Sequence, residues 1–101
     1  MAERAHTTAE PLDVASVRKD FPILENRDGL IFLDSAASSQ KPTQVLDAMR
    51  HYYEHDHANV HRAAYDLAEA ATNALEGARA KVARFLGSGD PAEVAFTKNA
   101  T

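Results

Sequence analysis

Residues 30–42 have the sequence LIFLDSAASSQKP, and this stretch decides which fold the sequence predicts. Leu30–Leu33 is a short, continuously apolar run, which is typical of a strand buried on both faces of a sheet. A loop of small residues, 34–40, follows it, and Pro42 suits the first turn of a helix, where its missing N–H costs nothing. The order of strand, loop and helix predicts an α/β protein.

A short helix is predicted before this stretch. Asp13 can cap it, it covers residues 14–20, and Pro22 ends it by disfavouring helical geometry at Phe21. Residues 26–29, Asn-Arg-Asp-Gly, indicate a turn.

Two longer helices are predicted after it. The first runs from Pro42 to about His55 and is followed by a connection at 56–64. The second begins near Asp66, which has capping-box spacing to Glu69. It carries one apolar stripe and ends at Gly87, where a left-handed residue is favoured. The stripe consists of Leu67, Ala71, Ala74, Leu75, Ala78, Val82, Phe85 and Leu86.

The last predicted element is a strand at 93–97, followed by Lys98, Asn99, Ala100 and Thr101. These four residues resemble the start of a strand-to-helix turn, in which backbone N–H groups and the helix dipole bind phosphate. They lack the glycines of a Walker loop or a dinucleotide fingerprint. The predicted order is therefore helix, short strand, two helices and strand.

The composition limits the function classes. The 101 residues include 20 alanines and carry a net charge of −4 with scattered basic residues, which argues against a nucleic-acid surface. There is no cysteine, so neither a disulfide nor a thiol nucleophile lies in these residues. Residues 1–11 are expected to be a disordered leader without the apolar run of a secretion signal, and a cytoplasmic location is expected.

Two loops are candidate binding segments. In 34–39, the small side chains of Ala36 and Ala37 would let their backbone approach a ligand closely; an ordinary serine-rich connection is the alternative. His61 lies on a connection rather than on a helix stripe, where it could stack on a ring or move a proton near neutral pH. A surface histidine packed beside Arg62 is the alternative there.

A second cluster of histidines suggests a metal site only weakly. His51 and His55 are four residues apart and share a helix face, with Glu54 and His57 nearby, and such pairs can hold zinc or nickel. A site needs three or more convergent ligands, so no metal is predicted. A small His-rich metal-binding or interaction module stays as an alternative function.

Four blocks in this order carry a family resemblance. They are FPIL at 21–24, FLDSAASSQKP at 32–42, NVHR at 59–62 and FTKNAT at 96–101. Together they resemble the opening of a cysteine desulfurase, in the class V aminotransferase family and in the branch of selenocysteine lyases and iron–sulfur cluster assembly. The resemblance covers roughly residues 14–101.

The resemblance implies a transferase of fold type I that uses pyridoxal 5′-phosphate and works as a homodimer. Such enzymes convert L-cysteine to L-alanine and leave a persulfide on a cysteine of the enzyme. The persulfide sulfur can then pass to a sulfur-acceptor protein. By position, it implies that Ala36 and Ala37 line the substrate pocket, that His61 is catalytic, and that Ala100 and Thr101 meet the cofactor phosphate.

The sequence departs from the family pattern at a few positions. Ala63 stands where the family usually has Gly, Tyr65 replaces a common His, Ala68 a common Ser, and Ala100 a frequent Thr. These departures leave cysteine and selenocysteine open as substrates. Other class V enzymes, such as kynureninase-like proteins or epimerases, stay as alternatives.

The chain is expected to be an incomplete, amino-terminal segment of the enzyme. Residues 12–101 would form the start of the small domain and the beginning of the large cofactor domain. The pyridoxal lysine and the sulfur-accepting cysteine would lie downstream, so the segment alone is expected to be inactive.

Overall fold

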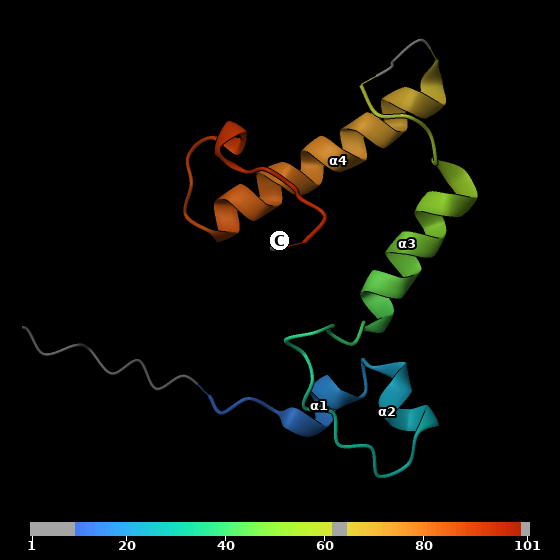
Figure 1. Cartoon of the computed structure of the whole chain (residues 1–101), viewed down its shortest axis with the longest axis vertical. Coiled ribbons are helices and arrows are strands. Elements are labelled where there is room, and N and C mark those ends of the chain that lie inside the picture. The colour runs from blue at the N-terminus through green and yellow to red at the C-terminus, as the bar shows by residue number, and fades with distance from the viewer. Residues whose placement is uncertain (1–9, 62–64, 100–101) are drawn as a thin grey trace, which may run out of the picture. The chain divides into compact units, whose positions relative to one another are not determined.

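A computed structural model describes residues 10–61 and 65–99 of the chain, and the regular structure there is helical (Figure 1). The elements, in order, are α1 (Val14–Arg18), α2 (Pro22–Asn26), α3 (Thr43–His55), α4 (Asp66–Phe85) and a 3-10 turn, η1 (Pro91–Glu93). The chain divides into two compact units, Met1–Asp47 and Ala48–Thr101, and the boundary falls within α3. The leader predicted at 1–11 lies mostly outside the described residues; Glu10 and Pro11 are exposed.

Helix α1 confirms the predicted short helix and its cap. The Asp13 side chain accepts hydrogen bonds from the Ser16 N–H at 3.2 Å and the Ser16 hydroxyl at 2.7 Å. The hydroxyl first, and then the N–H, lower the pKa of Asp13 from its usual 3.8, because both donate to the ionised carboxylate. The cap therefore depends on Asp13 being charged.

Helix α2 was not predicted. Pro22 occupies its first turn, and Phe21 before it is extended, with φ −105° and ψ 101°. Phe21 therefore lies outside a helix, as predicted, whereas Pro22 was predicted only to end one helix and here also begins the next. The predicted turn follows, and Gly29 has a φ of 72°.

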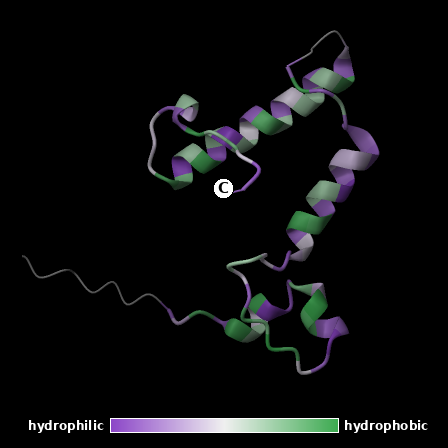
Figure 2. Ribbon diagram, viewed as in Figure 1, coloured by the Kyte–Doolittle hydropathy of each residue, from purple (hydrophilic) through white to green (hydrophobic). Residues whose placement is uncertain are grey.

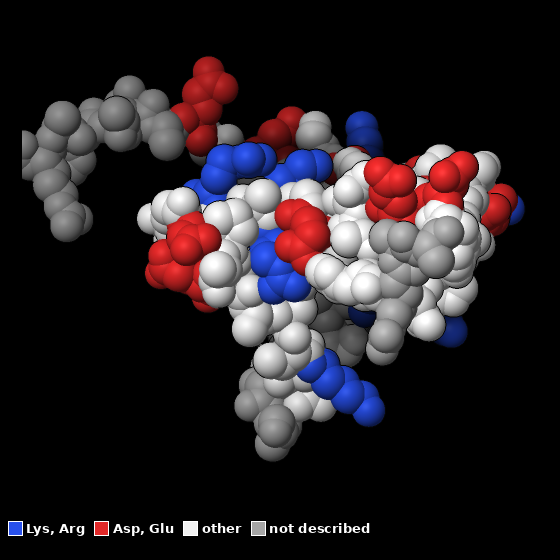
Figure 3. Space-filling view, turned by 90° about the horizontal axis from the view of Figure 1, so that it is seen from above, with Lys and Arg blue, Asp and Glu red and all other residues white. Residues whose placement is uncertain are grey.

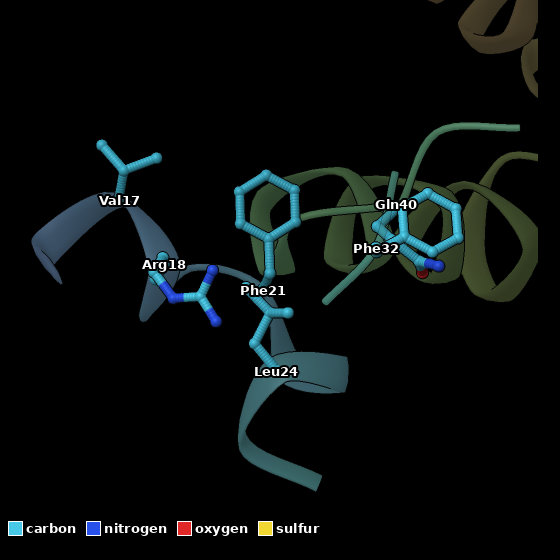
Figure 4. A pocket seen from close by; sticks show the side chains of 6 residues that line it. All are labelled: Val17, Arg18, Phe21, Leu24, Phe32 and Gln40. Atoms are coloured by element: carbon cyan, nitrogen blue, oxygen red, sulfur yellow. The ribbon is translucent and has the colours of Figure 1, made fainter. Parts of the chain in front are cut away.

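The same unit holds an apolar hollow of about 180 Å³ (Figure 4). Beside it, the Asp20 carbonyl accepts from both the N–H and the hydroxyl of Thr43, at 2.7 and 3.1 Å, which fixes the start of α3. The hollow is lined by Val17, Arg18, Phe21, Leu24, Phe32 and Gln40.

Neither predicted strand is formed in the described residues. Residues 30–33 have no regular structure, and the side chains of Ile31 and Leu33 are 80% and 91% exposed rather than buried. In 93–97, Glu93 is the last residue of η1. Val94 has extended backbone angles but is not part of a strand ladder. A strand needs a partner for its N–H and C=O groups, and no second extended segment of the described residues pairs with either run.

Helix α4 dominates the second unit, but its buried face differs from the predicted stripe. The buried core consists of Ala68, Ala71 and Ala83, whereas Phe85 and Leu86 are 88% and 69% exposed. Figure 2 shows apolar and polar residues interspersed along the helix. The stripe prediction is right at Ala71, which is buried, and in part at Leu75 and Val82, which are half-buried, but its other members are exposed. Alanine occupies many of the apolar positions of α4, so the sequence pattern does not specify which face is covered.

The two predicted ends of α4 have opposite outcomes. Tyr65 is the N-cap and its side chain makes no capping hydrogen bond, so the capping box expected from Asp66 and Glu69 is not formed. Both acidic side chains lie in the first turn, where their negative charge interacts favourably with the helix dipole. At the other end, Gly87 has a φ of 78°. Its N–H donates to the Arg84 carbonyl at 3.1 Å, and the Ser88 N–H donates to the Ala83 carbonyl at 2.8 Å. This is a Schellman motif, as the glycine predicted.

The segment after the Schellman motif turns back along α4 (Figure 1). Asp90 caps η1 by accepting the Ala92 N–H at 2.9 Å. The chain after η1 therefore passes the middle of α4, where the polar contacts described below are made.

The Asp13 cap should weaken in acid. Because folding lowers the pKa of Asp13, the stabilisation is fully present above pH 3.8 and is lost as the pH falls through the lower, folded pKa. The amide proton shift of Ser16, followed by NMR from pH 6 to about pH 2, should change with a midpoint below 3.8. In Asp13→Asn this step should vanish; a midpoint at or above 3.8 in the parent would contradict the cap.

Two glycines should respond to alanine with opposite signs. A Cβ meets nothing within 4 Å at either Gly87 or Gly77, so only the backbone decides. Gly87→Ala places alanine in a left-handed conformation and should destabilise the chain by roughly 1–2 kcal/mol. Gly77→Ala lies inside α4 and should stabilise it by roughly 0.5–1 kcal/mol. Denaturant unfolding followed by circular dichroism measures both; equal signs would contradict the assigned Schellman motif.

Candidate functional site

His61 is held in an unusual backbone conformation. Its φ is 58°, which makes it the one non-glycine residue with positive φ in the described ranges. Its N–H donates to the Thr72 hydroxyl at 2.8 Å, and that hydroxyl donates to the Ala68 carbonyl at 2.8 Å. One hydroxyl on α4 therefore anchors the connection that carries His61, and it supports a backbone region that a non-glycine residue seldom adopts.

The His61 ring also lies against α4, through Glu76. Nε2 is 3.1 Å from Glu76 Oε1, and the other carboxylate oxygen, Oε2, accepts from Arg79 Nε at 3.0 Å. The side chains of His61, Glu76 and Arg79 are 57%, 43% and 21% exposed. One carboxylate thus lies between a histidine that stays open to solvent and an arginine that is largely covered.

Arg79 extends this network to the segment after η1. Its Nη1 donates to the Val94 carbonyl, and its guanidinium lies 5.1 Å from the centroid of the Phe96 ring. A planar guanidinium can hold a carboxylate and a carbonyl while stacking on an aromatic ring, which a lysine cannot do. Three segments, around His61, along α4 and at 94–96, therefore meet at Glu76 and Arg79.

Ala36 and Ala37 lie in the other compact unit. They are exposed and form a tight turn in which the Ala37 and Ser38 N–H groups both donate to the Asp34 carbonyl, at 3.1 and 3.2 Å. The predicted loop of small residues is therefore present, with backbone that a ligand can approach. Its assignment to a substrate pocket stays a prediction.

The predicted phosphate-binding residues, Ala100 and Thr101, lie outside the described residues. The chain just before them bends at Lys98 and Asn99, and the Thr97 hydroxyl donates to the Asn99 carbonyl at 3.0 Å. The cofactor contacts implied by the resemblance thus stay predictions.

The histidines of α3 are not arranged as metal ligands. His51 and His55 stack with ring centroids 4.3 Å apart and planes 18° apart, and His55 Nδ1 lies 3.0 Å from the His51 carbonyl. His57 lies against the rings of Tyr52 and Tyr53 instead. No group of three candidate ligands converges among the described residues. The alternative of a metal-binding module gains no support.

Charge and hydropathy add little to this site. On the face shown in Figure 3, the described acidic and basic side chains are interspersed, so that face offers no single basic surface. No helix within residues 10–61 and 65–99 is both long and apolar enough to cross a membrane.

Thr72, Glu76 and Arg79 were missed by the sequence analysis. They recur at spacings of four and three, which places them on one face of α4. The signal was available, because these polar residues lie on the same side as buried Ala68 and Ala71. A polar row beside a buried alanine row indicates contacts with a neighbouring segment rather than with solvent.

The comparisons now define the class of protein. The sequence model of the class V aminotransferase family matches residues 31–101. The chain belongs to this family, whose members are enzymes that use pyridoxal 5′-phosphate.

Within the family, the chain is similar to cysteine desulfurases, as the four sequence blocks predicted. It is 56% identical over 94 residues to a probable cysteine desulfurase of Streptomyces coelicolor, which covers 89% of this chain and 22% of that protein. It is 51% identical over 94 residues to one from Synechocystis, with 90% and 22% covered.

A solved structure agrees with these sequences. The apo structure of a cysteine desulfurase from Thermococcus onnurineus NA1 is 40% identical, with a TM-score of 0.74 over 85% of this chain and 20% of that one. This neighbour has the fold of type I pyridoxal-phosphate enzymes, which supports the predicted fold class, although the two predicted strands are not formed in residues 10–61 and 65–99. The chain spans about a fifth of the length of these relatives.

The Thr72 hydroxyl should control the His61 connection. Thr72→Val keeps the shape but removes the acceptor of the exposed His61 N–H, at a cost of about 0.5–1.5 kcal/mol, the net contribution of one hydrogen bond. Amide hydrogen exchange at His61 should speed up markedly in Thr72→Val and change little in Thr72→Ser, which keeps the hydroxyl. Equal exchange in the parent and in Thr72→Val would contradict the anchor.

Proposed function

We propose that this chain is the amino-terminal part of a cysteine desulfurase, which converts L-cysteine to L-alanine and an enzyme persulfide. The observation that carries the proposal is His61, whose backbone is anchored on α4 while its ring stays more than half exposed. The similarity to proteins named cysteine desulfurase supports it.

The proposed reaction balances without a further reactant. The Cβ–Sγ bond of L-cysteine breaks, a sulfur–sulfur bond forms on an enzyme cysteine, and Cβ gains a proton to give alanine. The 101 residues contain no cysteine, so this chain cannot supply the sulfur acceptor. The part proposed for it is to bind and orient substrate and cofactor, and on its own it is proposed to be inactive.

Each candidate residue has a stated role in this proposal. Ala36 and Ala37 would border the substrate through their exposed backbone. His61 would lie at the active site, where its imidazole can accept or donate a proton. Ala100 and Thr101 would meet the cofactor phosphate through backbone N–H groups.

Two features of the described residues, the His61 imidazole and the segment Thr97–Asn99, are consistent with binding of pyridoxal phosphate. When bound, pyridoxal phosphate serves as an electron sink for the substrate amino acid. An exposed imidazole with a fixed backbone suits a position beside a heteroaromatic ring, and His61 meets both conditions. Thr97–Asn99 leads into the pair proposed for the phosphate.

Finer parts of the proposal rest on the same similarity. We propose a homodimer in the cytoplasm that supplies sulfur to an acceptor protein for iron–sulfur cluster assembly. The choice between cysteine and selenocysteine as substrate would be influenced by the departures at Ala63 and Tyr65, because both follow His61 closely in the sequence.

The proposal predicts alanine formation by the full-length protein that contains this chain. With pyridoxal phosphate and L-cysteine, it should form alanine together with protein-bound sulfur, while the 101-residue chain should form neither. His61→Gln should lower kcat/KM by about 10²-fold or more, since an acid–base group contributes that much.

His57→Gln is the matched control, because His57 lies against tyrosine rings and is proposed to have no part in the reaction. Alanine measured by amino-acid analysis and sulfur measured after reduction report the two products. Turnover of an amino acid without protein-bound sulfur would favour another class V reaction, and turnover by the 101-residue chain would overturn the proposal.

A further inference from the structure

The ring of His61 meets a carboxylate at one nitrogen only. Glu76 Oε1 lies 3.1 Å from Nε2, and within the described residues Nδ1 has no such partner. An ionised carboxylate can only accept, so it favours a proton on the nitrogen that faces it. The neutral ring beside Glu76 should then carry its proton on Nε2 and leave Nδ1 as the acceptor.

Glu76 is itself held from the other side. Arg79 Nε donates to Oε2 at 3.0 Å and keeps the carboxylate from turning away from His61. Arg79 is in turn fixed by the Val94 carbonyl and the Phe96 ring, and its side chain is only 21% exposed. The pair Glu76 and Arg79 therefore contacts the segment before α4 through His61 and the segment after it through Val94 and Phe96.

These contacts join segments that lie far apart in the sequence. His61 lies on the connection before α4, whereas Glu76 lies on the helix itself. Arg79 contacts Val94, which is 15 residues further along the chain. A surface ion pair between Glu and Arg three positions apart on a helix contributes little stability by itself. Its position between a histidine and a backbone carbonyl indicates a role in orientation instead.

We propose that Glu76, held by Arg79, is a positioning residue that fixes the His61 ring as the Nε2–H tautomer and presents Nδ1 as the proton acceptor. This inference rests on the proposed function, because it makes His61 useful to a reaction at Nδ1. Glu76 touches neither substrate nor cofactor in this proposal and acts through His61.

The test uses the full-length protein loaded with pyridoxal phosphate and labelled with ¹³C and ¹⁵N in its histidine rings. The resonances of His61 are assigned by their loss in His61→Gln. In the parent, ring shifts near neutral pH should report the Nε2–H tautomer. In Glu76→Ala they should report a mixture of tautomers, while the matched control Glu69→Gln, which changes an exposed acid of the same helix, should leave them as in the parent.

Kinetics with L-cysteine provide the second measurement. Glu76→Ala should lower kcat by about tenfold to a hundredfold, as misplacing a reacting group does, with KM changed by less than about threefold. Circular dichroism identifies any variant that fails to fold, and Glu76→Gln, which keeps the side-chain shape, then replaces Glu76→Ala. Parent-like tautomer shifts in the folded Glu76 variant would overturn the positioning role.

The two proposals fail separately. If the full-length protein makes no alanine from cysteine but the tautomer of His61 changes in Glu76→Ala, the positioning role stands and the proposed reaction is wrong. If alanine is formed and the Glu76 variants keep both the parent tautomer and the parent kcat, the reaction stands and the positioning role is wrong.

Discussion

In the second unit of this protein, one carboxylate links the side chains that hold the flanking segments. Glu76 faces His61 with one carboxylate oxygen and Arg79 with the other, and Arg79 also donates a hydrogen bond to the Val94 carbonyl. Apolar packing cannot do this alone, because the buried core of the described residues consists of three alanines, whose methyl groups remove little surface from water. Polar contacts on one face of α4 therefore determine where the flanking segments lie.

The helices could be predicted from the sequence because their signals are local. Asp13 and Gly87 act within a few residues of their own positions, and both end effects are observed as the residue types predict. Helix α2 was missed for the same local reason, since Pro22 both ends one helix and begins another. Alanine obscured the buried face of α4, because it fits every side of a helix.

The strands could not be confirmed because a strand is not a local structure. Residues 30–33 and 93–97 have the apolar composition of strands, but composition alone does not supply the neighbouring chain that a ladder requires. The exposure of Ile31 and Leu33 shows the consequence: large apolar side chains without a covering layer. In the relatives, which are about four times as long, such a layer can come from the rest of the chain.

The candidate site was predictable in part. His61 stood out because it lies on a connection, and the structure gives it a fixed backbone and an open ring. Glu76 and Arg79 did not stand out, because their partners are distant in sequence and each alone has the character of a helix surface residue. Ala36 and Ala37 lie in a turn as expected, but in the other unit, while Ala100 and Thr101 lie outside the described residues.

A crystal structure of the full-length protein with pyridoxal phosphate and a bound cysteine analogue tests the account most directly. The distances to measure are those from Glu76 Oε1 to His61 Nε2 and from His61 Nδ1 to the analogue. The account predicts that the first stays near the 3.1 Å seen here and that the second is within hydrogen-bonding range. A Glu76 side chain turned to solvent, with His61 pointing away from the analogue, would contradict it.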